Sequence, residues 1–155
     1  CALPISADTH RIVSHLLKYN FKPSLVFEHI YEMFSLARMK LLGIALGNLK
    51  IDKTKRIAWM VVSQEILRKA KAKLEDTEGF IEMIRSIEGI RLAVLFQEIE
   101  KNKVKVGFRS RGGLDAGRLA RILGGGGHFA ASGCILEGKL KEIEKLVLSR
   151  IKREI

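Results

Sequence analysis

The sequence predicts an α/β fold: a mixed sheet flanked by helices and preceded by an all-helical connector. Two observations predict it. Up to about residue 50, apolar residues recur at helical spacing, whereas from residue 52 short apolar runs alternate with helical segments. A length of 155 residues suits one compact domain with a helical attachment, and 47% apolar residues are enough for a packed core. The predicted division is a helical connector over 1–50 and a sheet domain over 52–155.

The connector is expected to hold three helices. Ser6 or Asp8 can cap the first, because short polar side chains accept from free amides at a helix start. Pro23 stands where the second would begin, a position that tolerates the missing N–H. The third is predicted from about Ser35 to Leu49, with apolar residues on one face.

Four strands are expected in the sheet domain. Ile57–Val62 and Leu92–Phe96 are apolar at nearly every position, as in strands covered on both faces. Lys103–Arg109 alternates instead, so Val104, Val106 and Phe108 are predicted to face the core. A last strand is expected near Cys134–Leu136, where Cys134 is interpreted as a small buried hydrophobe.

Helices are predicted between and after these strands. Ser63 can cap one that ends near Lys73, and Asp76 or Thr77 can cap another that Gly89 stops. A short helix follows the alternating strand. The closing helix is expected to bury the residues that recur along one of its faces, Leu140, Ile143, Val147 and Ile151.

Charge and composition narrow the class of protein. Lys and Arg number 28 against 17 Asp and Glu, a net charge of +11 that favours a polyanionic partner. Two cysteines rule out a disulfide framework and a cysteine-based zinc site. No apolar run reaches the roughly 18 residues of a membrane span, so no membrane partner is expected and the cytoplasm is the expected location. Abundant Lys, Arg, Glu and Ile with three Asn and two Gln resemble a thermophile's composition.

Four consecutive glycines, Gly124, Gly125, Gly126 and Gly127, are followed at once by His128. Ordering four glycines costs conformational entropy. Without a Cβ, their main-chain amides can close around a phosphate or a base edge. A helix starting near His128 would add free N–H groups. The alternative is a flexible surface loop with an incidental histidine, and the glycines alone do not decide between them.

Basic residues beside this loop favour the binding interpretation. The alternating strand places Lys103, Lys105 and Arg109 on one face, and Arg111 extends the row. A guanidinium grips phosphate through a bidentate fork. The alternative for Lys103 and Lys105 is an edge strand protected by charge. Phe129 can stack on a base, although a core position is the favoured interpretation for it.

Catalysis by this chain alone is not expected. Phosphodiester hydrolysis usually needs two metals held by clustered Asp and His. Asp8, His10 and His15 are close in sequence, yet their spacings do not bring all three to one helix face. Ser110 and Ser132 have no evident base nearby. The sequence predicts binding without chemistry.

The pattern Val106-Gly107-Phe108-Arg109-Ser110-Arg111, then Asp115, then Gly124–Gly127 followed by His128-Phe129-Ala130-Ala131-Ser132-Gly133 resembles the C-terminal DHH-associated domain of the DHH phosphoesterase superfamily. Four glycines match the nanoRNase / pAp phosphatase branch. The resemblance covers roughly 52–155, and 1–50 resembles the end of a catalytic domain with its connecting helix. Gly107 and Phe129 depart from the family's usual residues.

The resemblance implies a substrate-binding role. It assigns substrate contacts to Arg109 and Ser110 and to the loop of Gly124, Gly125, Gly126, Gly127 and His128. The basic row read from the strand pattern adds Lys103, Lys105 and Arg111 as candidate phosphate contacts. The expected ligand is a short oligonucleotide or a nucleotide such as pAp. No metal is expected in this chain. Manganese is expected in an N-terminal catalytic domain of the same parent chain, which would be the parent's hydrolase, and the first residue, Cys1, fits a piece of a longer protein.

Two other functions stay open. One is an RNA-binding module of a larger fusion, for example with a tRNA nucleotidyltransferase, in which the +11 charge serves a long polyanion. The other is an interaction domain with a vestigial loop, which binds no nucleotide. The salt dependence of binding separates the first from a nucleotide pocket.

Overall fold

The computed structural model describes residues 6–19 and 22–155, and these fall into two units. The first, up to Phe34, holds α1 (Ala7–Leu16), the 3-10 helix η1 (Leu17–Tyr19) and α2 (Pro23–Tyr31). The side chain of Ser6 accepts from the amide of Thr9, so Ser6 caps α1 as expected, and Pro23 opens α2. All the described residues of α1 and α2 are exposed within this structure.

The second unit, Ser35–Ile155, contains the sheet. It begins with α3 (Leu36–Gly47), which Ser35 caps. The sequence placed this helix in the connector over 1–50. The structure packs it with the sheet instead, because Leu41 and Ala45 are fully buried in the same core as strand residues Ala58 and Met60.

Six strands form one mixed sheet in the order β1-β2-β3-β4-β6-β5. β2 and β3 are parallel and every other pair is antiparallel. The α/β class with a mixed sheet is confirmed. The strand bounds are as follows: β1 (Lys50–Asp52), β2 (Ile57–Val62), β3 (Leu92–Glu100), β4 (Lys103–Ser110), β5 (Gly126–His128) and β6 (Ala131–Glu137).

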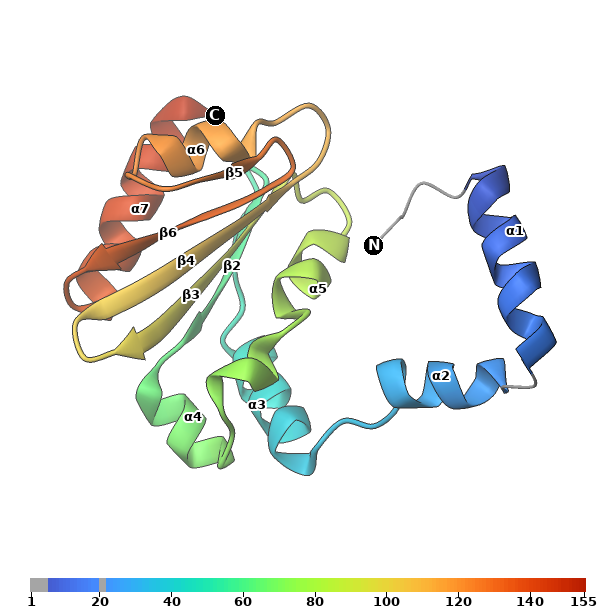
Figure 1. Cartoon of the computed structure of the whole chain (residues 1–155). Coiled ribbons are helices and arrows are strands. Elements are labelled where there is room, and N and C mark those ends of the chain that lie inside the picture. Colours follow the sequence, from blue (N-terminus) through green and yellow to red (C-terminus); the bar gives the residue numbers. More distant parts are fainter. Residues whose placement is uncertain (1–5, 20–21) are drawn as a thin grey trace. The chain divides into compact units, whose positions relative to one another are not determined.

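Helices cover both faces of the sheet (Figure 1). α6 (Ala116–Arg121) and α7 (Leu140–Glu154) lie on one face, over the core-facing residues Val104, Val106 and Phe108 of β4. Ile143, Val147 and Ile151 of α7 are buried there, as predicted. Cys134 is also buried in this layer, so its interpretation as a small hydrophobe is confirmed.

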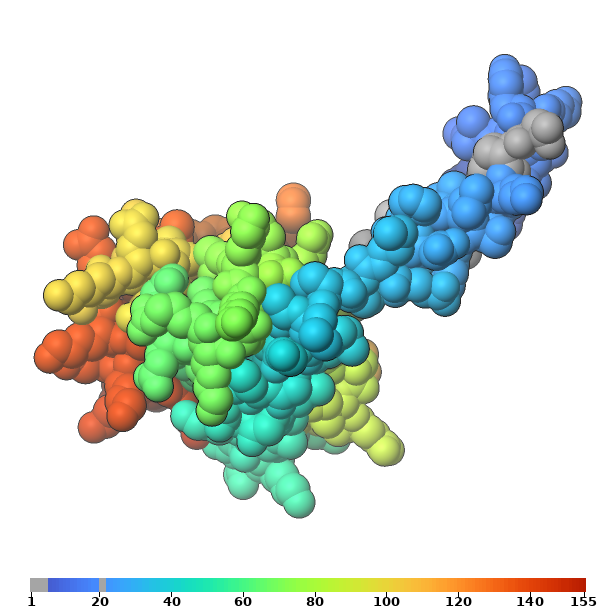
Figure 2. Space-filling model, turned by 90° about the horizontal axis from the view of Figure 1, so that it is seen from below, coloured from blue at the N-terminus to red at the C-terminus, as the bar shows by residue number. Residues whose placement is uncertain are grey.

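The other face is covered by α3, α4 (Gln64–Ala70) and α5 (Phe80–Ser86), and the 3-10 helix η2 (Leu74–Thr77) lies between the last two in sequence. In Figure 2 the cyan and green segments of α3 and α4 lie side by side. The predicted cap of α5 was wrong: Gly79 precedes this helix. The carboxylate of Asp76 instead accepts from the amide of Lys73, so it caps the start of η2.

This second layer is incomplete. The core beneath α3–α5 draws its strand residues from β2 and β3, and among the described residues it includes none from β5 or β6. Strands β6 and β5 therefore keep one face open within this unit. We call this face, with the basic β4 residues paired to it, the open strip. It comprises Ala131, Gly133, Ile135 and Glu137 of β6, Gly126 and His128 of β5, and Lys103, Lys105 and Arg109 of β4.

Candidate functional site

Arg109 and His128 lie in one row across the sheet. Arg109 of β4 pairs with Ala131 of β6, and Ala131 pairs with His128 of β5. Directly paired residues point to the same side of a sheet. The two basic side chains therefore flank the methyl group of Ala131, with their Cα atoms about 10 Å apart, since neighbouring strands are about 4.8 Å apart. This spacing leaves room for an anion between them.

The adjacent row carries no side chains. Gly107 of β4 pairs with Gly133 of β6, which pairs with Gly126 of β5. A Cβ on Gly126 would meet nothing within 4 Å, so this end of the row opens to solvent. A Cβ on Gly107 would lie 3.2 Å from Ile81 of α5, so the other end is roofed by that helix. The row forms a flat main-chain floor beside the two basic residues.

The guanidinium of Arg109 is fixed by two neighbours. Its Nε donates to Oε1 of Glu82 at 2.9 Å, and its Nη1 donates to the carbonyl of Phe108 at 3.1 Å. The Arg109 side chain is 30% exposed. Because a guanidinium has five N–H donors, these two bonds leave three for a ligand. Glu82 lies 27 positions earlier in the chain, so sequence spacing gave no signal for this contact.

The glycine run is not a helix start, which corrects the sequence interpretation of His128. Gly126–His128 is the edge strand β5, and it turns through Phe129 and Ala130 into β6. The amides of Gly124 and Gly125 are already bonded, to the carbonyls of Arg121 and Ala120 at the end of α6. An edge strand bonds its neighbour through alternate residues, so β5 also directs main-chain groups outward.

Two of the glycines are required by close approach. A Cβ on Gly125 would lie 2.2 Å from the carbonyl oxygen of Gly133, and one on Gly127 would lie 2.5 Å from Cα of Ser132. Gly127 also has a φ of +138°, which side chains rarely adopt. The run therefore lets β5 lie tightly against β6, and His128 is exposed at its end.

Ser110 lies on the opposite face of β4 from Arg109. It is 2% exposed, and its hydroxyl donates to the carbonyl of Phe129 at 3.3 Å. Its amide donates to the carbonyl of Ala130 at 3.1 Å. In this geometry Ser110 supports the turn that follows His128.

Phe129 is not in the core, contrary to the favoured interpretation from sequence. It is 57% exposed in the turn between β5 and β6, because its carbonyl is what the fold uses: the amide of Ala116 donates to it at 2.7 Å. Phe129 directly follows His128 in the sequence, and its ring is open to solvent.

The three other basic residues named from the sequence differ in their surroundings. Lys105 is exposed on the same face of β4 as Arg109. Lys103, two residues further away, is paired with Glu100 at 3.4 Å. Arg111 follows the end of β4 and is exposed. Arg121 of α6 was not predicted as a site residue. Its Nη1 lies close to the glycine run, because this atom and the carbonyl oxygen of Gly127 would each be 3.2 Å from a Cβ on Gly117.

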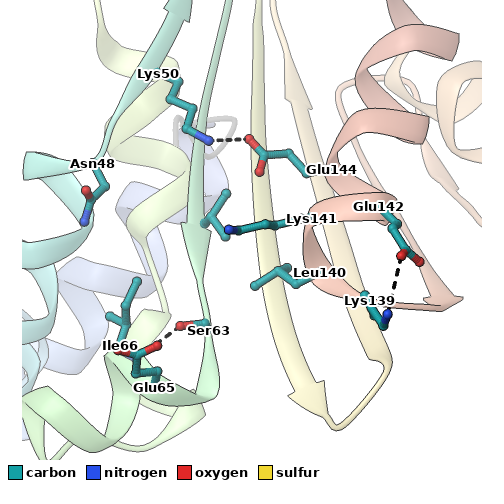
Figure 3. Close-up of a pocket in the computed structure, with 11 residues that line it drawn as sticks. Asn48, Lys50, Ser63, Glu65, Ile66, Lys139, Leu140, Lys141, Glu142 and Glu144 are labelled. Atoms are coloured by element: carbon teal, nitrogen blue, oxygen red, sulfur yellow. Dashed lines mark hydrogen bonds and ion pairs between the residues drawn. The ribbon is translucent and has the colours of Figure 1, made fainter.

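A hollow of about 580 Å³ lies at the other end of the sheet, between the start of α7 and the end of β2 (Figure 3). Its lining includes three lysines and three glutamates, so its charges balance. Lys50 pairs with Glu144 at 2.6 Å, and Lys139 with Glu142 at 3.8 Å. This balance makes the hollow a poorer match for a polyanion than the row of Arg109 and His128.

The described part of the chain has no group of three or more His, Cys, Asp or Glu side chains placed to hold a metal ion. The manganese pair that the family resemblance implies is expected in the N-terminal catalytic domain of the parent chain, and this stays a prediction. Burial raises the pKa of the Cys134 thiol to about 11, which keeps it protonated. Within residues 6–19 and 22–155, no helix has the length and apolar character needed to cross a membrane.

Comparison with known proteins agrees with the motif. The model of the DHHA1 domain matches residues 57–153, and the chain belongs to this family. Two curated relatives are both named bifunctional oligoribonuclease and PAP phosphatase NrnA. The Thermus thermophilus protein is 40% identical over 82 residues, 52% of this chain and 25% of the relative. The Bacillus subtilis protein is 32% identical over 125 residues, 81% of this chain and 39% of the relative.

The chain therefore spans well under half the length of the curated relatives it matches. Among solved structures, an exopolyphosphatase-related protein from Bacteroides fragilis aligns with a TM-score of 0.83 at 26% identity, over 96% of this chain and 44% of that one. A pGpG-specific phosphodiesterase from Vibrio cholerae aligns with a TM-score of 0.56 at 12% identity, over 99% and 53%, which shows the fold alone. The resemblance to the nanoRNase branch is confirmed.

Proposed function

We propose that this chain is the substrate-binding domain of a DHH-type phosphoesterase that acts on short oligonucleotides or pAp. The observation that carries the proposal is the row in which Arg109 and His128 flank the small side chain of Ala131. A terminal phosphate between them would receive charge-assisted hydrogen bonds from both sides. The printed names of both curated relatives, oligoribonuclease and PAP phosphatase, support the substrate class.

In this proposal each predicted residue has a distinct part. Arg109 and His128 bind the terminal phosphate. Gly126 and Gly127 lie against the nucleotide with main-chain groups, while Gly124 and Gly125 join them to α6. Ser110 holds the turn that presents His128. The exposed ring of Phe129 is available to a base, where stacking on an aromatic side chain is sequence-tolerant.

Chemistry is assigned to a separate N-terminal domain of the same parent chain, which would supply the manganese. The 155-residue chain would position the end of the substrate, and positioning supplies a large share of rate acceleration. Accordingly, manganese and pAp added to this chain should yield no phosphate. Phosphate release would show that the chain itself holds a catalytic centre.

Arg109→Ala tests the phosphate site. We expect this variant to weaken pAp binding, measured by calorimetry, by about 1.5–3 kcal/mol, the range for hydrogen bonds to charged groups. Arg153→Ala is the matched control, because it removes the same charge from the exposed surface of α7. Equal affinities for the two variants would overturn the assignment of Arg109.

A further inference from the structure

We propose that the open strip holds a second phosphate of a short single-stranded oligonucleotide at Lys105, with Ile135 contacting the base between the two phosphates. The inference rests on the proposed function, since it takes Arg109 and His128 as the first phosphate position. It separates the two substrate types that the family resemblance leaves together, oligonucleotide and pAp.

The register places Lys105 on a line with the first site. Lys105 pairs with Ile135 of β6, two rows beyond the row of Arg109 and Ala131, and on the same face because side chains alternate with period two. The Cα atoms of Arg109 and Lys105 are about 13 Å apart, given a rise of about 3.3 Å per residue. This spacing of the Cα atoms exceeds one nucleotide repeat of an extended strand, so the proposal assigns Lys105 to a phosphate beyond those of a single nucleotide held at Arg109.

The surface between the two positions suits a nucleoside. The row between them is that of Gly107, Gly133 and Gly126. Ile81 of α5 roofs it at Gly107, so its flat main-chain surface is open on the side of Gly126. Ile135 then stands up from β6 with 56% of its surface exposed. An exposed, β-branched apolar residue in the middle of an open sheet face gives a base an apolar surface to lie against.

Charge limits the track at its far end. Beyond Lys105 the next row on this face pairs Lys103 with Glu137, and Lys103 is also bonded to Glu100 at 3.4 Å. Two carboxylates thus surround the last lysine and disfavour a further phosphate. The basic part of the strip therefore extends from Arg109 and His128 to Lys105, which matches a strand with two phosphate positions.

The test compares pAp with the 5′-phosphorylated trinucleotide pApApA on the full 155-residue chain, by calorimetry at several salt concentrations. Lys105→Met should weaken trinucleotide binding about three- to ten-fold and should change the affinity for pAp by less than about two-fold. For the trinucleotide alone, the slope of log K against log salt should become shallower by about 0.7, the loss of one phosphate contact. Lys141→Met, with the same charge change on α7, should alter neither ligand by more than two-fold.

A second variant addresses the base contact. Ile135→Thr keeps a β-branched side chain and should weaken the trinucleotide several-fold without changing its salt slope. The proposal is overturned if Lys105→Met affects both ligands equally, or affects the trinucleotide no more than Lys141→Met does. Failure of the proposed function looks different: wild-type chain would bind neither ligand, or Arg109→Ala would leave both affinities unchanged.

Discussion

Arg109 is held by a carboxylate that also competes with its proposed ligand. Glu82 accepts from Nε at 2.9 Å, which orients the guanidinium, but its negative charge opposes an incoming phosphate. The two side chains are 30% and 41% exposed, so solvent screens the pair and its own stabilisation is small. Orientation and repulsion therefore act in opposite directions on nucleotide affinity.

Replacing Glu82 separates these two effects. Glu82→Gln keeps an oxygen that can accept from Nε while removing the charge, so we expect pAp to bind about two- to five-fold more tightly, within the range of an exposed ion pair. Glu82→Ala removes both and should bind pAp less tightly than the Gln variant. Calorimetry on both variants, with thermal melts to verify folding, measures the difference. Equal affinities for Gln and Ala would show that Glu82 does not orient Arg109.

At the scale of one element, the four glycines of the β5 segment are not equivalent. Gly125 and Gly127 lie so close to β6 that an added Cβ would overlap its backbone, whereas a Cβ on Gly126 would enter open space. Gly126 is also in the row next to Arg109 and His128, on the same face. One glycine is thus free to change without disturbing the fold, yet it borders the proposed ligand.

This difference predicts opposite behaviour for two single substitutions. Gly125→Ala should lower the free energy of unfolding by about 1–3 kcal/mol, because its methyl group would lie 2.2 Å from the Gly133 carbonyl oxygen. Gly126→Ala should leave stability within about 0.5 kcal/mol and weaken pAp binding by placing a methyl group on the floor of the site. Urea unfolding and calorimetry measure the two quantities. A Gly126→Ala protein with unchanged affinity would place the nucleotide elsewhere.

Local sequence pattern predicts the exposed face of β4 but not the strand β5. The alternation from Lys103 to Arg109 follows directly from burying every second residue, so the face that carries Arg109 was predictable. β5 was not, because glycine has no strand preference and three residues give no period. Its conformation is set by pairing with β6 and by the bonds of Gly124 and Gly125 to α6. The core position expected for Phe129 was wrong because the pairing of β5 with β6 places this residue in an exposed turn, whatever the apolar character of its ring.

Contacts between distant segments lie beyond local pattern altogether. Glu82 reaches Arg109 because α5 crosses over β3 and β4, a topology that no local spacing encodes. Asp52 of β1 is tied to Lys152 of α7 at 2.6 Å, one hundred positions later in the chain. Such pairs follow from the order of the strands once the sheet has formed.

The Asp52–Lys152 pair gives the sheet unit a pH-dependent stability. The hydrogen bond from Lys152, followed by that from the amide of Lys55, lowers the pKa of Asp52 below its usual value. Because folding lowers the pKa of Asp52, its carboxylate stabilises the folded state at neutral pH. This stabilisation is lost as the pH falls through the folded-state pKa. Asp52→Asn should lower the thermal midpoint at pH 7, and the difference from wild type should shrink as the pH falls below 3.8, the ordinary pKa of an aspartate. The exposed pair of Asp8 and Arg11 provides the control: Asp8→Asn should change the midpoint little at either pH.

At the scale of the whole molecule, the net charge of +11 admits two kinds of partner, and salt distinguishes them. An RNA-binding module would spread its basic residues over many phosphates, whereas the proposed site would hold two phosphates, one at Arg109 with His128 and one at Lys105. Single-stranded nucleic acid releases counterions with a slope of about −0.7 per phosphate contacted, so the site predicts a slope near −1.4 for log K against log salt.

A twenty-nucleotide single strand should give nearly the same slope as the trinucleotide pApApA, because phosphates beyond the second meet Glu100 and Glu137. Fluorescence anisotropy between 50 and roughly 300 mM salt can measure both slopes, a range over which contacts to many phosphates lose orders of magnitude in affinity. A slope for the long strand several-fold steeper than for the trinucleotide would favour the RNA-binding module, since the extra contacts would then come from basic residues outside the open strip.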